Sequence, residues 1–171
     1  MAATDITRHT LSVLVQDVEG IISRVTGMFS RRGYNLVSLV SAATETEGIN
    51  RLTIVVDAND IVTEQVTKQL NKLIHVLKVV ELEEETTIAR SIMLVKVTAD
   101  NINRPQVVDA VNIFRARIVD VAQESVVVEA TGSPGKLRAL LDVLEPFGIR
   151  ELVQSGAVAL GRGPKAMAPA K

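Results

Sequence analysis

Apolar residues in the first half of the chain follow the spacing of strands and helices in turn. Residues 10–16 form an apolar, β-rich run, and after a break at 17–20 apolar positions recur at helical spacing. The predicted elements are a strand at 10–16, a helix that starts at Ile21 and ends at Gly33, strands at 35–43 and 50–57 joined by the polar hairpin 44–48, a helix at 62–73 capped by Asn59 or Asp60, and a strand at 75–82. Their order, β-α-β-β-α-β, is the split ferredoxin-like order.

The same order of elements returns after an acidic break at 83–87. Strands are predicted at 91–98, 118–122, 125–131 and 149–160, with one helix opened by residues 103–105 and another that Ser133 caps before Pro134. The fold class is therefore α+β, with two successive ferredoxin-like domains whose antiparallel sheets carry helices on one face. We expect a lead-in at 1–7, a first domain at 8–83, a linker at 84–90, a second domain at 91–161 and a flexible tail at 162–171.

Composition narrows the function classes. Hydrophobic residues make up 47% of the chain but aromatic residues only 2%, so the cores must be aliphatic. The absence of cysteine excludes disulfides, thiolate metal sites and cysteine nucleophiles. A net charge of −1, and predicted strands without aromatic side chains, argue against nucleic-acid binding. With no leader-like start and no apolar run of about 18 residues, we expect a cytoplasmic protein that does not contact a membrane.

No pattern in the sequence indicates catalytic or metal chemistry. A nucleophile needs an adjacent base, and the two histidines, His9 and His75, fall beside a strand and at a helix-to-strand junction. Gly132 to Gly135 precedes a helix but lacks the Lys-Ser/Thr of a phosphate-binding loop. The acidic run at 83–85 is typical of a solvated linker. We therefore predict no catalytic residues and no metal site.

The turn between the first strand and the first helix is the most informative segment. It delivers residues 15–21 into a helix N-terminus, where free amide groups and the positive end of the helix dipole attract an anion such as a carboxylate. Gly20 lets the backbone come close to such a group. Asp17 either accepts hydrogen bonds from an ammonium group or serves as an N-cap or turn residue, and spacing alone favours the N-cap or turn role.

Several segments resemble the small, regulatory subunit of acetolactate synthase. The resemblance spans roughly residues 9–163. Its segments are Leu11–Val15, Gly20, Ser23–Val25, Phe29–Asn35, Thr53–Val55, Lys68–Leu73 and Leu77–Val80 in the first half, and Ile92–Val97, Ile113–Arg115, Ile118–Val121, Gly135–Leu137, Ser155–Gly156 and Arg162–Gly163 in the second. The stretch Phe-Ser-Arg-Arg-Gly-Tyr-Asn separates this family from other ferredoxin-like domains.

The resemblance implies that the first domain is an ACT domain, an amino-acid sensor that pairs with a second copy and binds a branched-chain amino acid, usually valine, at the interface. It implies that this chain does no chemistry itself. A large catalytic subunit, which uses thiamine diphosphate, Mg²⁺ and usually FAD, is activated by it and becomes inhibitable by the end product of branched-chain amino acid biosynthesis. The effector-binding residues carried over from the family are Asp17, Val18, Gly20, Ile21, Asn35 and Leu36.

The chain departs from the family pattern at one position, and two alternative functions remain open. Relatives often carry proline or serine just before the glycine, whereas this chain has Glu19, whose carboxylate would weaken the binding of a second carboxylate. The rivals are an ACT-type sensor of a different enzyme and a small stand-alone ferredoxin-like enzyme. The second domain is expected to supply either a further contact between copies or a surface for the catalytic subunit.

Overall fold

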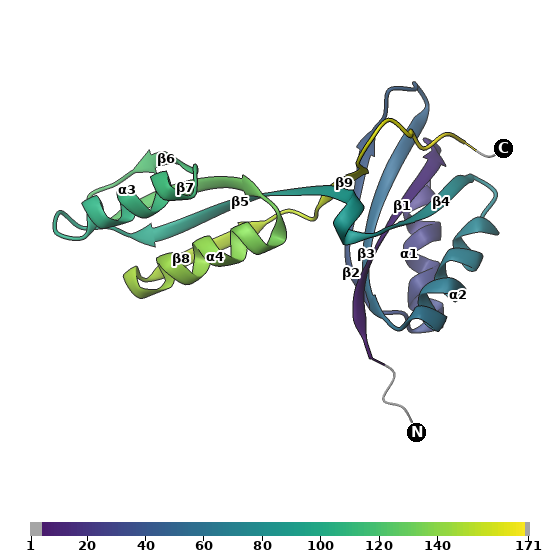
Figure 1. The fold of residues 1–171 in the computed structure, drawn as a ribbon, viewed down its shortest axis with the longest axis horizontal. Coiled ribbons are helices and arrows are strands. Elements are labelled where there is room, and N and C mark those ends of the chain that lie inside the picture. Colours follow the sequence, from purple (N-terminus) through teal and green to yellow (C-terminus); the bar gives the residue numbers. More distant parts are fainter. Residues whose placement is uncertain (1–4, 170–171) are drawn as a thin grey trace. The chain divides into compact units, whose positions relative to one another are not determined.

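The computed structural model describes residues 5–169, so the outermost parts of the predicted lead-in and tail lie outside the described residues. The chain divides into two compact units (Figure 1). The first holds residues up to Ile88 together with the chain from Ala159 onward, and the second holds Ala89–Val158. Each unit contains one antiparallel sheet with two helices on one face, which confirms the predicted fold class.

The first unit has the predicted β-α-β-β-α-β order. Its elements are β1 (Thr7–Gln16), α1 (Ile21–Arg32), β2 (Leu36–Ala43), β3 (Ile49–Ala58), α2 (Asp60–Asn71) and β4 (Val76–Leu82). The strands lie in the order β2-β3-β1-β4, so that β2 and β4 form the two edges. Of the two predicted caps for α2, the structure selects Asn59, whose side chain accepts a hydrogen bond from the amide of Val62 at 2.8 Å.

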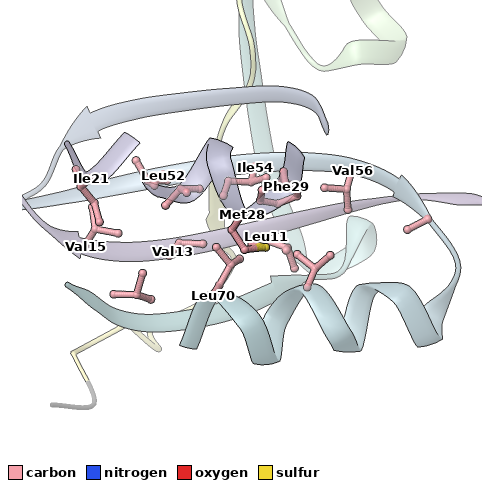
Figure 2. Close-up of a cluster of buried hydrophobic side chains, with 14 residues drawn as sticks. Leu11, Val13, Val15, Ile21, Met28, Phe29, Leu52, Ile54, Val56 and Leu70 are labelled. Carbon is pink, nitrogen blue, oxygen red and sulfur yellow. The ribbon is translucent and has the colours of Figure 1, made fainter. Parts of the chain in front are cut away.

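An aliphatic core lies between the sheet and the helices of the first unit (Figure 2). Alternate residues of the two central strands point into it, as the period of two in a strand requires. The helices contribute residues at helical spacing, including Phe29 and Leu70. The largest side chains of the core that are fully buried are Leu11, Phe29, Leu52, Ile54 and Leu70. Full burial of one such side chain contributes about 1.5–3 kcal/mol.

The second unit repeats this plan. Its elements are β5 (Thr87–Thr98), α3 (Arg104–Ile113), β6 (Arg117–Val121), β7 (Ser125–Gly132), α4 (Pro134–Leu144) and β8 (Ile149–Gln154), with the strands in the order β6-β7-β5-β8. Ser133 caps α4 as predicted, because its hydroxyl accepts from the amide of Lys136. A separate core of fourteen buried residues, among them Met93 and Leu140, fills the space between this sheet and its helices.

The end of the chain differs from the prediction. The single strand expected at 149–160 is two strands, β8 and β9 (Val158–Gly161). The break falls where the amide of Ser155 donates to the carbonyl of Ile92 and the Ser155 hydroxyl accepts from the amide of Ile92. After it, β9 pairs with β5, which starts at Thr87 instead of at Ser91. An apolar run in the sequence does not reveal that a strand is interrupted while it stays along the same partner, β5.

Candidate functional site

The turn between β1 and α1 has the backbone that its sequence predicts. Gly20, the N-cap residue of α1, has φ 78° and ψ 4°, the left-handed conformation that favours glycine. A Cβ atom there would meet nothing within 4 Å, so conformation and not space selects glycine in this structure. No side chain caps α1, and its first turn carries no acidic residue. Within the described chain, therefore, no carboxylate is hydrogen-bonded to the positive end of this helix.

Hydrogen bonds decide which amides of the turn can receive an anion. Of the amides in the predicted segment 15–21, that of Val18 already donates to the Gln16 carbonyl at 3.0 Å, and that of Ile21 donates to the Val18 carbonyl at 3.3 Å. Within the described part of the chain, four neighbouring amides have no such acceptor: those of Glu19, Gly20, Ile22 and Ser23. The last two were missed, although a glycine N-cap implies that the next amides along the helix are free.

The turn is held against the neighbouring hairpin. The amide of Asp17 donates to the carbonyl of Gly48 at 2.8 Å, and Gly48 itself has φ 77°. The amide of Gln16 donates to the carbonyl of His75 at 2.9 Å, and the Gln16 side-chain oxygen lies 2.7 Å from His75 Nδ1. The Asp17 and Glu19 side chains are exposed, so that two carboxylates stand in solvent beside the free amides.

Asn35 and Leu36 lie at the opposite end of the same sheet. The carbonyl of Asn35 accepts from the amide of Asp57 at 3.3 Å, and Leu36 pairs with Val56. By contrast, Gln16, next to the turn, pairs with Ile49. Asp57 and Ile49 are eight residues apart on β3, a separation of about 26 Å at roughly 3.3 Å per residue. One chain thus does not bring the two predicted halves of the site together.

An ion pair fixes the backbone next to Asn35. Arg8 and Asp57 are partners in the pairing of β1 with β3, and the guanidinium donates to both carboxylate oxygens at 2.8 and 2.9 Å. The hydrogen bond from Arg8 holds the pKa of Asp57 below its ordinary value, and the same bond raises the pKa of Arg8. The pair anchors the strand that positions Asn35, although its exposure limits its contribution to stability.

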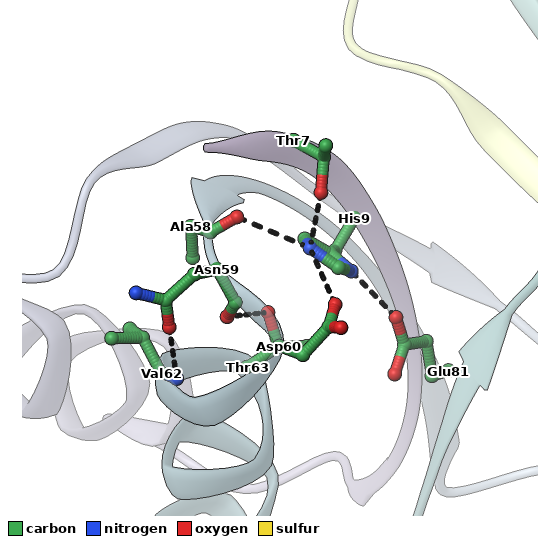
Figure 3. Close-up of polar contacts among 8 residues, drawn as sticks. All are labelled: Thr7, His9, Ala58, Asn59, Asp60, Val62, Thr63 and Glu81. Carbon is green, nitrogen blue, oxygen red and sulfur yellow. Dashed lines mark hydrogen bonds and ion pairs between the residues drawn. The ribbon is translucent and has the colours of Figure 1, made fainter. Parts of the chain in front are cut away.

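His9 forms a structural cluster at this end of the sheet (Figure 3). Its side chain is only 11% exposed. Nδ1 lies 2.6 Å from Glu81 Oε1, while Nε2 lies 2.9 Å from the hydroxyl of Thr7 and 3.2 Å from the carbonyl of Ala58. These contacts join β1 to β4 and to the end of β3. Acceptors thus surround both ring nitrogens, which is an arrangement that orients the ring and links strands.

Two other classes of site are absent from the part of the chain that the structure describes. Among residues 5–169, no group of three or more His, Cys, Asp or Glu side chains is arranged to hold a metal ion. In the same range no helix is long and apolar enough to cross a membrane.

Comparisons with known proteins agree over both units. A model of the AHAS small subunit-like ACT domain matches residues 11–78, and a model of the small subunit of acetolactate synthase matches residues 90–163. The chain is 55% identical over 163 residues to the acetolactate synthase small subunit of Mycolicibacterium smegmatis, covering 95% of this chain and 96% of that protein. It is 46% identical over 158 residues to a probable acetolactate synthase small subunit of Archaeoglobus fulgidus, covering 92% of this chain and 99% of that one.

A solved structure gives the same result. The crystal structure of the acetolactate synthase small subunit from Thermotoga maritima superposes with a TM-score of 0.85 at 34% identity, over 94% of this chain and 100% of that one. Sequence and fold therefore point to the same group of proteins over both units.

Proposed function

The chain belongs to the acetolactate synthase small-subunit family, and from this premise we propose that it activates the large catalytic subunit and makes that subunit inhibitable by valine. The chain is a regulatory small subunit, and its ACT domain supports amino-acid sensing. We further propose that the effector site is shared between two copies. One observation carries this proposal: the two halves of the predicted site lie at opposite ends of one sheet.

The edge strand β2 supplies a way to join these halves. Its outer side is unpaired in the described chain, and such an edge invites pairing with a second copy. In an antiparallel pair related by a two-fold axis, the start of each strand lies beside the end of the other. Ala43, at the end of β2, pairs with Asn50, which pairs with Val15 near the turn. Asn35 of a second copy would therefore arrive at the turn end of the first sheet.

The spacing across the sheet is compatible with a small ligand. β2 and β1 are separated only by β3, so the turn after β1 lies about 10 Å from the β2 edge in projection. Valine bound there would place its carboxylate against the four free amides, those of Glu19, Gly20, Ile22 and Ser23. Its ammonium group would meet Asp17 or Asn35 of the second copy. Its isopropyl group would pack on aliphatic side chains such as Leu36 and Val18.

The expected affinity suits feedback by a metabolite. A ligand of this size binds with about −4 to −8 kcal/mol, which corresponds to millimolar to micromolar dissociation constants. Regulation further requires that valine bind two conformations of the assembly unequally, because equal binding shifts no equilibrium. A coupling free energy of roughly 1–3 kcal/mol changes the response 5- to 150-fold.

In this proposal the large catalytic subunit carries out the reaction. The large subunit would hold thiamine diphosphate, Mg²⁺ and FAD, and this chain would contribute none of the reacting groups. The test is to mix the purified chain with the catalytic subunit. We expect acetolactate formation to rise on mixing and to fall again when valine is added, with no acetolactate formed by this chain alone. Unchanged activity of the catalytic subunit on mixing would contradict the assignment.

Complementation between variants tests the shared site. Gly20→Asp adds a carboxylate and backbone strain at the turn, and Asn35→Ala removes the other half, so each homodimer should bind valine at least tenfold more weakly. A mixed dimer of the two variants regenerates one intact site. Calorimetric titration of co-expressed, doubly tagged mixed dimers should therefore recover the wild-type affinity at half the wild-type stoichiometry.

Two substitutions in the second unit serve as controls. Gly135→Asp lies in the first turn of α4, where a Cβ meets nothing within 4 Å, and Asn112→Ala lies on the exposed side of α3. Both homodimers should titrate like wild type. If the mixed dimer shows no recovery while both controls bind normally, each site resides within one chain and the shared-site proposal fails.

A further inference from the structure

Gln16, the last residue of β1, is joined to His75, just before β4, by two hydrogen bonds. The amide of Gln16 donates to the carbonyl of His75 at 2.9 Å, and the Gln16 side-chain oxygen lies 2.7 Å from His75 Nδ1. Because an amide oxygen accepts and does not donate, Nδ1 carries a proton and donates it to Gln16. Two bonds between the same two residues fix their relative orientation, whereas a single bond leaves them free to rotate.

Gln16 also holds the first bend of the turn between β1 and α1. Its carbonyl accepts from the amide of Val18 at 3.0 Å, so that the backbone amide, the backbone carbonyl and the side-chain oxygen of Gln16 are all engaged. The free amides of Glu19 and Gly20 follow directly along the chain. The direction in which these amides point therefore depends on Gln16, and the orientation of Gln16 depends on His75.

The pair lies next to an irregularity in the sheet. The pairing of β1 with β4 shifts register between Leu14 and Val15, and Leu77 of β4 is passed over in the printed register of the two strands. Such a bulge interrupts the ladder of backbone hydrogen bonds and bends the strand. The bonds between Gln16 and His75 join the two segments again directly beyond this shift.

The second unit has the same backbone contact without the side-chain pair. There the amide of Thr98, at the end of β5, donates to the carbonyl of Gly148 at 2.9 Å. Gly148 has no side chain, and the hydroxyl of Thr98 accepts instead from Arg150 Nε at 3.0 Å. The backbone contact is thus common to both units and belongs to the fold. The bond between the side chains of Gln16 and His75 is the addition, and it stands beside the turn that carries the free amides.

We infer that Gln16 and His75 are positioning residues for the proposed effector site. They act through the backbone of residues 17–20, which they hold in the conformation that directs the free amides toward one carboxylate. A turn that leaves this conformation lowers the fraction of chains able to bind, and the apparent dissociation constant rises by the same factor. The effect on valine rests on the proposed function, whereas the ordering of the turn does not.

A double-mutant cycle in the full chain tests whether the two residues act through one bond. Gln16→Met removes the acceptor and His75→Phe removes the donor, and neither change removes the backbone bond. With the catalytic subunit present, each variant should need about three- to tenfold more valine for half-maximal inhibition, the range expected for the loss of one hydrogen bond. Activation without valine should stay within twofold. The double variant should match the single ones, because all three lack the same bond.

The equivalent bond in the second unit supplies the matched control. Arg150→Met removes the donor to the Thr98 hydroxyl and should leave the valine concentration for half-maximal inhibition within twofold of wild type. Circular dichroism checks that every variant is folded. Fully additive losses in the double variant would overturn the inference, because they would show that Gln16 and His75 act separately. A loss in Arg150→Met as large as in the first-unit variants would also overturn it.

Nuclear magnetic resonance without valine separates this inference from the proposed function. The ¹⁵N shifts of the His75 ring should place the proton of the neutral imidazole on Nδ1 in wild type and show a mixture of tautomers in Gln16→Met. The order parameters of the Glu19 and Gly20 amides should fall from about 0.85 to below about 0.6 in both single variants. If wild type confers no inhibition by valine, the proposed function fails, and these order parameters still decide whether the pair holds the turn. Order parameters that stay at the wild-type value in both variants would overturn the inference, whether or not valine binds.

Discussion

The two units share one order of elements, but the amides of their first strand–helix turns differ in hydrogen bonding. In the first unit the turn after β1 leaves a row of amides without acceptors, and glycine stands at the helix N-cap. In the second unit the turn after β5 satisfies itself. Asp100 Oδ1 accepts from the amides of Ile102 and Asn103 at 2.8 and 2.9 Å, and Asn103 Oδ1 accepts from the amide of Asp100 at 2.8 Å.

Arginine completes the second turn. Arg104, the first residue of α3, donates through Nη2 to the carbonyls of Ala99, Ala122 and Gln123 at 2.6–2.9 Å. The Arg104 guanidinium thus donates to backbone carbonyls. The Asp100 carboxylate accepts from the amides to which an external carboxylate would have to bind. The same topology therefore gives an open anion-binding turn in one domain and a closed, structural turn in the other.

The outward faces of the two sheets differ as well. In the first unit Ser12, Leu14 and Thr53 point away from the helices yet are buried. Arg51 Nη1 donates to the hydroxyl of Ser12 at 3.1 Å and lies 3.9 Å from Met167 Sδ, so part of the C-terminal segment packs with this unit. The corresponding face of the second sheet exposes Leu94 and its neighbours. Among the described residues, the outward face of the second sheet therefore exposes Leu94, whereas the outward face of the first sheet buries Leu14.

Core truncations in matched helices should have the largest effects and would test whether the two units are energetically separate. Leu70 of α2 and Leu140 of α4 are both fully buried. Replacement by alanine removes buried methyl groups and leaves a cavity, which costs about 2–5 kcal/mol in each case. Hydrogen exchange followed by mass spectrometry should show that Leu70→Ala lowers protection only in the first unit and Leu140→Ala only in the second. Loss of protection throughout the chain in both variants would mean that the units unfold together.

A smaller effect should follow from neutralising the carboxylate beside the open turn. Glu19 is exposed and adjoins Gly20, so its charge repels a carboxylate bound at the free amides. At roughly 6 Å in water this repulsion changes a dissociation constant by about threefold. Glu19→Gln should therefore bind valine about threefold more tightly in calorimetric titration.

High salt and a substitution at a second position serve as the two controls for Glu19→Gln. The gain from Glu19→Gln should shrink in high salt, because exposed charges are screened. Glu45→Gln, in the hairpin after β2, should bind like wild type. Unaltered affinity in Glu19→Gln at low salt would show that the carboxylate does not face the ligand.

The sequence predicted the architecture better than it predicted the site. Periodicity gave both β-α-β-β-α-β units, and Gly33 adopts the left-handed conformation expected after α1, with φ 65°. Such features are local, since each depends on the residue itself and its neighbours within a turn. The division of the 149–160 run into β8 and β9 depends on pairing with β5, a partner some sixty residues away, and no local pattern encodes it.

Long-range strand register also explains why the arrangement of the site residues could not be predicted from the sequence. Asn35 and Gly20 are close in sequence, but the order β2-β3-β1-β4 and the register of β3 place them at opposite ends of the sheet. Likewise, the engagement of the Val18 and Ile21 amides follows from how the turn bends and not from residue type. The exposure of Leu94 and Val153 on the second sheet could not be predicted either, because alternation identifies two faces of a strand without showing what covers either.

The smallest effect concerns pH and separates the closed turn from the open one. Backbone hydrogen bonds from the amides of Asn103 and Ile102 hold the pKa of Asp100 below its ordinary value. Because the folded pKa lies below the unfolded one, this carboxylate stabilises the second unit above about pH 4, and the stabilisation is lost as the pH falls through the folded pKa. Asp100→Asn should lower the Tm by no more than about 2 °C at pH 7, and the difference from wild type should narrow as the pH falls below about 4. Asp17→Asn is the matched control in the open turn, where no backbone amide of the described chain donates to the carboxylate, and differential scanning calorimetry should find its Tm equal to that of wild type over the same pH range. An equal pH-dependent loss in both variants would mean that the two turns use their aspartates alike, and the contrast between an open and a closed turn would not hold.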